Sequence, residues 1–257
     1  MYSFKDLKKA TGTDTVQLPS VAINFNGKQL DTEIEAFQTL KVSGRETISV
    51  ELETVDVRNG SLILDERLPH RELLVTYLMA SKSNTAFQND FKALRKLLTT
   101  DNEVPITFKD EPNTVYFGRL ADMETVDDDS NTVIGTFKII CSSPFKYSNA
   151  VTTTGAVTID TFYPTQPDKI TLTVGNTTNK IQIKHNGYTI SATGTFNAGA
   201  KVVFNFAKED MTMTVNGVES TYMIDLNSDF ENFELKKGQS VTSTQGTISL
   251  VARERWL

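Results

Sequence analysis

The sequence has little of what enzymes and secreted proteins usually carry. Its 257 residues include one cysteine, Cys141, so no intrachain disulfide can form. There are two histidines, His70 and His185, and neither has a second His or Cys at metal-ligand spacing. We therefore expect no metal site. The thiol ends the apolar run FKIIC, which predicts a buried core cysteine rather than a reactive one.

Long apolar runs are absent as well. No window approaches the roughly 18 consecutive apolar residues of a membrane-spanning helix. The N-terminal stretch MYSFKDLKKATGTDT lacks the apolar core of a signal peptide. We therefore expect a soluble protein that is made in a cytoplasm and does not insert into a membrane.

The chain also lacks the basic stripe that phosphate binding needs. Residues 1–148 contain 17 Lys and Arg against 22 Asp and Glu, a balance of −5, and residues 149–257 contain 9 against 10, a balance of −1. These two balances add to the net charge of −6. Recognition of nucleic acid is therefore disfavoured.

Catalytic motifs are missing too. Neither phosphate-cradling pattern, G-x-x-x-x-G-K-S/T or G-x-G-x-x-G, occurs, and there is no G-x-S-x-G elbow. The S-x-x-K match of Ser143 and Lys146 ends a predicted strand, so we interpret it as coincidence. The acidic run Asp127-Asp128-Asp129 lacks the alternation and turn glycine of a calcium loop and is typical of a solvated hairpin tip. The sequence predicts no enzyme and no cofactor.

What the chain does have is β-structure. Asn-Gly occurs at four places, at residues 26, 59, 186 and 216, and this pair supplies the positive φ that two-residue hairpin turns need. Alternating or Thr- and Val-rich runs predict further strands. These runs are ETISVELE, ELLVTYLMA, VPITF, VYFGRL, GTFKIIC, DKITLTV, KVVFNF, FENFEL and GTISLVA, with MTMTV and VESTYMI around the last Asn-Gly. The run ELLVTYLMA has apolar residues on both faces, which predicts a strand covered on both sides.

One segment has a helical period instead. In SNTAFQNDFKALRKLL the apolar residues Phe87, Phe91, Leu94 and Leu98 fall on one helical face. Ser83, Asn84 or Thr85 can cap the start, and cations near the end suit the helix dipole. We predict one amphipathic helix packed on a sheet.

A Thr-rich segment with few charges, at about residues 148–165, marks a domain boundary. We predict an N-terminal β-domain with one helix, residues 1–148, and an all-β domain, residues 149–257. The second domain carries several aromatic residues that could stack on sugars, although their strand positions are also typical of a core. These are Tyr188, Phe196, Phe204, Phe206, Tyr222, Phe230 and Phe233. Carbohydrate binding through this domain stays open as the alternative function.

Several pieces, in this order, resemble the distal tail proteins of siphophages that infect Gram-positive bacteria. They are FNGKQL, GRETISVELETVDVRNG, DERLPHRELLVTYLM, FQNDFKALRKLL, FKDEPN with YFGRL, the stretch FKIICSSPFKY, and the terminal RERW. The order of the last three is the most specific part. The family usually has Asp before the proline of PFKY, where this chain has Ser143.

The resemblance implies a mainly β fold with a ring-forming N-terminal domain and a C-terminal galectin-like β-sandwich. It implies a hexameric ring in the virion, at the distal end of the tail. The ring would join the tail tube protein to a tail-associated lysin or tail fibre, and the outer domains would carry receptor-binding baseplate proteins.

An acidic first half suits a ring lumen through which DNA passes without binding. Part of the −5 balance is therefore expected to face the lumen. The candidates are Asp31, Glu33, Glu35, Asp127, Asp128 and Asp129.

Overall fold

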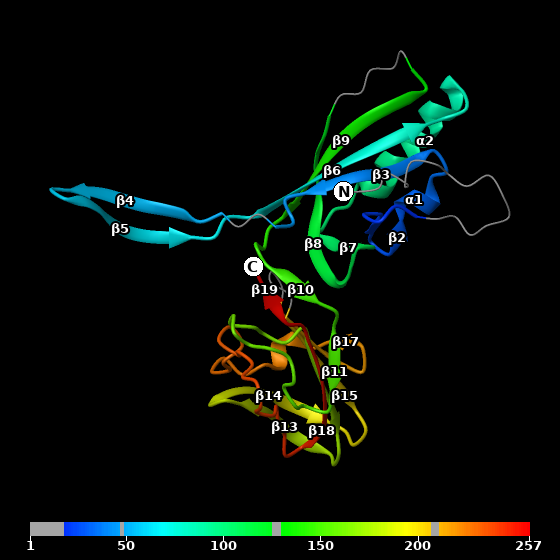
Figure 1. Ribbon diagram of the computed structural model, residues 1–257. Coiled ribbons are helices and arrows are strands. Elements are labelled where there is room, and N and C mark those ends of the chain that lie inside the picture. The colour runs from blue at the N-terminus through cyan, green and yellow to red at the C-terminus, as the bar shows by residue number, and fades with distance from the viewer. Residues whose placement is uncertain (1–17, 47–48, 125–129, 207–210) are drawn as a thin grey trace. The chain divides into compact units, whose positions relative to one another are not determined.

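The computed structural model describes residues 18–46, 49–124, 130–206 and 211–257. The chain divides into two compact units (Figure 1). Unit 1 ends at Lys146 and also takes in Leu257, and unit 2 runs from Tyr147 to Trp256. This division lies two residues before the boundary that the sequence predicts, at 148.

Unit 1 is built on one strongly connected antiparallel sheet, with strand order β2-β1-β7-β8-β9-β6-β3. Each strand pairs with its neighbours in a defined register, and α1 lies between β2 and β3 in the chain. The elements are β1 (Ile23–Phe25), β2 (Lys28–Gln29), α1 (Leu30–Glu33), β3 (Phe37–Ser43), β4 (Glu51–Val57), β5 (Gly60–Arg67), β6 (Arg71–Ala80), α2 (Asn84–Leu98), β7 (Val104–Phe108), β8 (Glu111–Met123) and β9 (Thr132–Cys141). The strands β4 and β5 form a separate two-stranded sheet.

The core of unit 1 lies between one face of this sheet and helix α2. In β6 the alternate residues Leu73, Val75, Tyr77 and Met79 are buried, and they join the apolar face of α2 in one cluster. The Ser83 side chain caps α2 by accepting the Ala86 backbone N–H at 3.2 Å. The predicted amphipathic helix and the packing of its apolar face on a sheet are therefore confirmed.

The other face of β6 is not covered by the described part of the chain. Leu74 on this face is 40% exposed, and Ile134 on the neighbouring β9 is 68% exposed. The expectation that β6 is covered on both sides is wrong for a single copy, because the apolar residues on its second face have no layer above them here.

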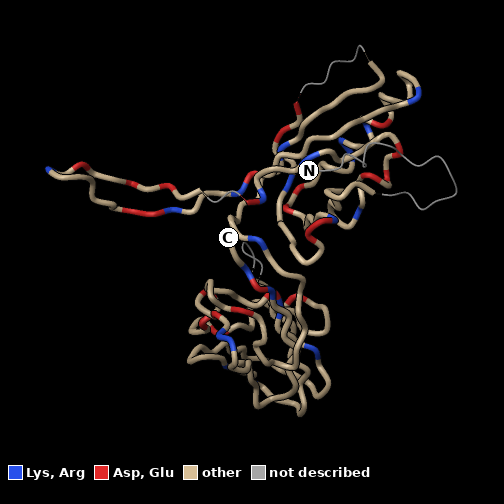
Figure 2. The backbone as a smooth tube through the Cα atoms, in the orientation of Figure 1, with Lys and Arg blue, Asp and Glu red and all other residues tan. Residues whose placement is uncertain are grey.

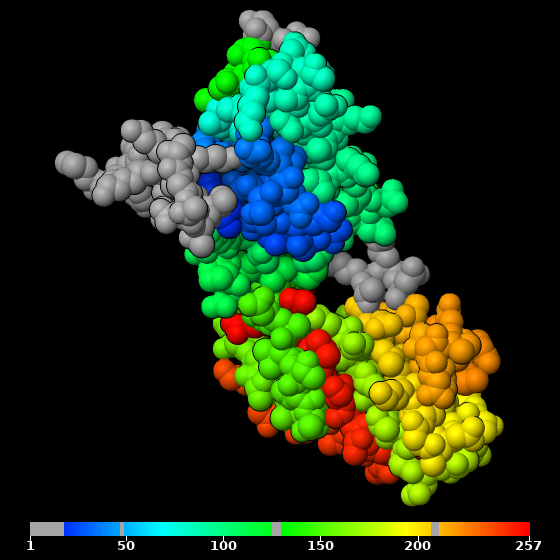
Figure 3. Space-filling view, turned by 90° about the vertical axis from the view of Figure 1, so that its right-hand side faces the viewer, coloured from blue at the N-terminus to red at the C-terminus, as the bar shows by residue number. Residues whose placement is uncertain are grey.

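Unit 2 is a two-layer β-structure. Its larger sheet has the order β11-β18-β12-β15-β16-β17, and β13 pairs with β14 in a second sheet. The strands of these two sheets are β11 (Val151–Thr153), β12 (Lys169–Val174), β13 (Thr178–His185), β14 (Tyr188–Phe196), β15 (Lys201–Phe206), β16 (Met211–Val215), β17 (Val218–Glu219) and β18 (Gly246–Ala252), with a 3-10 helix η2 at Thr221–Met223. The short strands β10 (Lys146–Ser148) and β19 (Arg255–Trp256) pair with each other outside these two sheets. Residues from both sheets share one core cluster. Figure 3 shows the surface of the red β18 beside the green segment that includes β11.

Three of the four Asn-Gly pairs form the predicted hairpin turns. Asn26, Asn186 and Asn216 have positive φ, as do the glycines that follow them. At the remaining pair, Asn59-Gly60, only the glycine has positive φ. The two-residue loop there is Arg58-Asn59, because Val57 pairs with Gly60.

Two strand predictions in unit 2 are wrong. The run FENFEL contains no strand, because Phe230 and Phe233 are both buried at a spacing of three, which an alternating strand cannot provide. The run VESTYMI is a strand only at β17 and then turns into η2. The remaining predicted strands of unit 2 are present.

Candidate functional site

The most unusual surface of unit 1 is the hairpin of β4 and β5, which we call the arm (residues 51–67). Figure 1 draws it as a separate ribbon of two strands, and every one of its residues is exposed. Six apolar side chains are about half exposed along it: Leu52, Val55, Val57, Leu62, Ile63 and Leu64, at 49–58%. An isolated hairpin is marginally stable in water. The arm is therefore built to pack against another surface.

Register divides one face of the arm into an apolar and an acidic part. Toward the turn, Val55 lies opposite Leu62. Toward the root, Glu53 lies opposite Asp65, and Glu51 lies opposite Arg67, whose Nε is 3.4 Å from the Glu51 carboxylate. Residues 51–67 contain five Asp and Glu and two Arg, so the arm carries a charge of −3.

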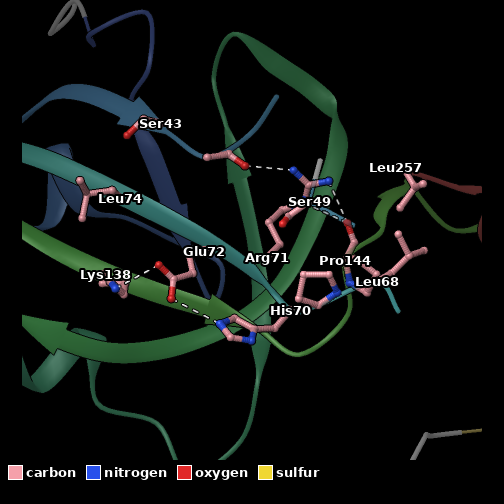
Figure 4. Close-up of a pocket in the computed structure, with 12 residues that line it drawn as sticks. Ser43, Ser49, Leu68, His70, Arg71, Glu72, Leu74, Lys138, Pro144 and Leu257 are labelled. Carbon is pink, nitrogen blue, oxygen red and sulfur yellow. Dashed lines mark hydrogen bonds and ion pairs between the residues drawn. The ribbon is translucent and has the colours of Figure 1, made fainter. Parts of the chain in front are cut away.

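The root of the arm is clamped by a buried cation, Arg71. Its guanidinium donates to the carbonyl oxygens of Gly44 (3.0 Å) and Arg45 (2.7 Å) from Nη1, and to Pro144 from Nε and Nη2 at 3.0 and 2.8 Å (Figure 4). Three carbonyls from two separate segments therefore converge on one fork-shaped donor. This geometry fixes the backbone where the chain leaves β3 for the arm.

A second arginine holds the same turn from the other side. Arg45 binds both carboxylate oxygens of Asp110, at 2.8 and 2.9 Å, and its guanidinium lies 5.1 Å from the centre of the Phe108 ring. A bidentate pair of this kind adds directional constraint as well as attraction. The arm itself is exposed, but the backbone at its root is rigidly placed.

A cavity of about 540 Å³ lies at this root. Its polar lining includes a chain of ionic contacts, in which Glu72 is 3.0 Å from Lys138 Nζ and 3.3 Å from His70 Nε2 (Figure 4). Lys138 in the first place, and then His70, holds the pKa of Glu72 below its ordinary value. The Lys138 ammonium offsets the charge of the Glu72 carboxylate, as in a structural ion pair.

Two other groups that could carry chemistry, Cys141 and His185, are buried. Burial raises the pKa of the Cys141 thiol to about 12, so little reactive thiolate forms at neutral pH. His185 is buried, and its Nε2 accepts the Lys236 backbone N–H at 2.9 Å. Among the described residues, no group of three or more His, Cys, Asp or Glu side chains is placed to hold a metal ion. No helix in the described part of the chain is long and apolar enough to cross a membrane.

The six acidic candidates for a lumen have different surroundings. Asp31 is buried, and its carboxylate accepts hydrogen bonds from the Thr39 backbone N–H (2.7 Å) and hydroxyl (2.8 Å). Its side chain therefore serves the fold. Glu33 is exposed, and the exposed Glu35 lies 3.3 Å from Lys82 Nζ. Asp127, Asp128 and Asp129 lie outside the described residues.

Most aromatic residues considered for sugar stacking belong to the core of unit 2. Phe196, Phe204, Phe206, Phe230 and Phe233 are buried, and Tyr188 is half-buried. Tyr222 is 82% exposed, and Phe162, which the sequence analysis did not single out, is 84% exposed.

Sequence reasoning did not identify the arm as a functional element. It predicted a half-buried strand from ETISVELE. The available signal was the acidic content of the two strands of the arm, which carry five carboxylates between Glu51 and Glu66. A strand that faces a core seldom has so many charges.

Comparisons with known proteins agree with this architecture. Residues 25–160 match the family model described as phage tail protein RIFT-related domain, and residues 160–256 match the one described as siphovirus-type tail component, C-terminal domain. The distal tail protein of Bacillus phage SPP1 is 33% identical over 132 residues, which are 50% of this chain and 51% of the relative. That match therefore spans about half the length of the relative.

Solved structures show the same fold over most of the chain. The crystal structure of the SPP1 Dit protein, described as a paradigm of the hub adsorption apparatus in phages that infect Gram-positive bacteria, has a TM-score of 0.71 at 24% identity. The similarity covers 92% of this chain and 99% of that one. A chain of the phage P2 baseplate in its calcium-activated conformation has a TM-score of 0.62 at 8% identity, covering 85% and 90% of the two chains.

Proposed function

Because the chain belongs to the siphophage distal tail protein family, we propose that six copies of it close into a ring at the tip of the tail. The ring joins the tail tube protein to the tail-associated lysin or tail fibre, and it carries receptor-binding baseplate proteins. Its role is structural. It positions other proteins by shape and by buried surface, not by catalysis.

The arm is the observation that carries this proposal. Its six apolar side chains expose about half of their surface in a single copy, and burying them against another chain is favourable at roughly 25 cal/mol per Å². An arm on each copy that packs on the next copy is a heterologous contact, and such contacts close into rings when the rotation permits. Arg71 and Arg45 hold the backbone and side chains at the end of β3, a few residues before the arm begins.

The open face and edge of the sheet support the same assembly. Within the described residues β3 is the last strand of the unit 1 sheet and pairs with β6, and an edge strand left exposed is an aggregation hazard in a monomer. Leu74 and Ile134 leave apolar surface on the uncovered face beside it. Ring formation would cover the edge and bring six such sheets around one axis.

The lumen of this ring is proposed to repel DNA. Residues 1–148 have a charge balance of −5, and an acidic wall disfavours contact with a polyanion. Since Asp31 is occupied in the fold, the described candidates for the wall are Glu33 and Glu35. A ring structure with both carboxylates on the outer rim would refute this assignment.

The assembly is tested by light scattering on the full chain, alone and co-expressed with the neighbouring tail proteins. We expect a particle six times the 28.6 kDa of one chain. Replacement of residues 51–67 by a short Gly-Ser linker should leave unit 1 folded and the particle dissociated. A matched control, V218S/L226S, removes two exposed apolar side chains from unit 2 and should keep the hexamer. A wild-type chain that stays monomeric under both conditions would contradict the ring.

A further inference from the structure

The arm contains a pair of carboxylates that the described chain does not neutralise. Glu53 and Asp65 are directly opposite each other across β4 and β5, so their side chains share one face. Both are exposed, and neither makes an ion pair within the described residues. Like charges placed directly opposite on a two-stranded ribbon destabilise it. The pair is therefore unfavourable unless a cationic surface meets it.

Helix α2 contains the complementary arrangement. Lys92 and Lys96 are one helical turn apart, both are exposed, and neither makes an ion pair with any described residue. Like charges at this spacing repel each other on a helix surface. Arg95, between them in the chain, lies with its guanidinium 5.4 Å from the centre of the Phe91 ring and adds to the positive charge. Figure 2 shows acidic residues on the arm and basic residues on the helix.

Some other cations of unit 1 have partners, and the exposed Lys28, Lys41 and Arg58, which make no ion pair within the described residues, stand singly in separate parts of the unit. Lys138 binds Glu72, Lys82 binds Glu35, and the Lys109 ammonium donates to the Leu18 carbonyl at 2.9 Å. The two lysines of α2 are therefore adjacent positive charges without an ion-pair partner among the described residues.

The spacings of the two pairs match. Cβ atoms of directly opposite residues on an antiparallel ribbon are about 4.5–5.5 Å apart. Cβ atoms one turn apart on a helix are about 5–6 Å apart. Two carboxylates can thus face two ammonium groups in parallel, so that the two repulsive pairs together form two attractive contacts.

We propose that Glu53 and Asp65 of the arm bind Lys92 and Lys96 on helix α2 of the neighbouring copy in the ring. The partner is a second copy because both surfaces are exposed within one chain, so the arm does not lie on its own helix. Each copy then gives one arm and receives one, as a heterologous ring requires. The inference rests on the proposed hexamer and names the surfaces that join its members.

Charge exchange tests the contact in the full chain. The variant E53K/D65K and the variant K92E/K96E should each place like charges together and weaken assembly about a hundredfold or more, measured as the concentration at which the particle dissociates. The combined four-residue variant restores opposite charges and should restore the hexamer. Controls with the same charge changes on exposed residues of unit 2 are E231K/E234K and K201E/K236E, and they should assemble as the wild type does.

A second measurement does not depend on a stable purified particle. The variant E53C/K92C, treated with a short bis-maleimide reagent during co-expression or at high concentration, should give a ladder of covalently linked chains on a denaturing gel. Either single variant should give at most dimers. Cys141 is buried and does not compete.

The outcomes separate this inference from the ring itself. A hexamer that tolerates both charge reversals, or a four-residue variant that fails to recover assembly when each pair alone disrupts it, overturns the contact and leaves the ring standing. Absence of a ladder from E53C/K92C also overturns it. A wild-type chain without any self-association contradicts the proposed ring and this contact together.

Discussion

Arg71 and Pro144 lie 73 positions apart in the chain, and the Arg71 guanidinium donates two hydrogen bonds to the Pro144 carbonyl oxygen, at 3.0 and 2.8 Å. The same guanidinium holds the carbonyls of Gly44 and Arg45 at the root of the arm. One buried side chain thus ties the start of the arm to the segment that leaves β9.

We expect Arg71→Ala to destabilise unit 1 by about 2–4 kcal/mol, because it removes several charge-assisted hydrogen bonds and leaves partly buried carbonyls without this donor. Arg71→Lys keeps the charge but loses the fork, and should recover only part of the loss. Denaturant unfolding followed at the transition of unit 1 measures both. The control is Arg58→Ala at the exposed arm turn, which should be nearly neutral. An Arg71→Ala chain as stable as this control would refute the clamp.

Asp31 gives a second stability prediction. Its carboxylate accepts two hydrogen bonds from Thr39, so Asp31→Ala leaves a buried backbone N–H and a hydroxyl unpaired. We expect a loss of about 2–4 kcal/mol in the free energy of unfolding. Glu33→Ala, two positions away and exposed, should change the free energy by less than about 0.5 kcal/mol. Equal effects of the two substitutions would show that Asp31 does not serve the fold.

Local patterns predicted the elements whose partners lie in the same chain. The apolar face of α2 and the cap at Ser83 were readable because the helix buries that face on β6. The turns at Asn26, Asn186 and Asn216 were readable because Asn-Gly takes positive φ at low cost.

Elements whose apolar faces the described chain leaves uncovered could not be predicted in this way. Alternation in the arm predicts a half-buried strand, and a pattern does not say whether the covering surface belongs to the same molecule. The same holds for Leu74 on β6, for which the sequence pattern predicts a buried position and which is 40% exposed. Local sequence does not reveal that Asp31 is buried, because its partner Thr39 lies eight residues away, in the next strand.

Cys141 should be inert in the folded chain. Burial raises the pKa of its thiol to about 12, and the side chain is enclosed in the core of unit 1. We expect Ellman's reagent to label less than about a tenth of the thiol near neutral pH, and all of it in guanidinium chloride. The variant Ser49→Cys, at an exposed position near the arm, supplies the positive control. Fast labelling of the native wild type would show that this part of the core opens readily.

The stability of unit 2 should fall in mild acid because of His185. Burial lowers the pKa of this imidazole below its ordinary value of about 6.5, so in mild acid the folded chain binds a proton at His185 less readily than the unfolded chain does. The unfolded state then binds more protons as the pH falls below about 6.5, and the free energy of unfolding decreases with it. Above that pH the contribution of His185 is fully present.

We expect the melting temperature of unit 2 to be about 2–4 °C lower near pH 5.5 than near pH 7.5. His185→Gln keeps an acceptor for the Lys236 N–H and should flatten this dependence. His70→Gln alters the exposed histidine of unit 1 and should leave the pH dependence of the unit 2 melting temperature unchanged. Burial also raises the pKa of Asp168, but that carboxyl titrates alike in all three chains and cancels in the comparison. If His185→Gln loses as much stability in acid as the wild type, the dependence arises from another group and the imidazole is not held neutral by the fold.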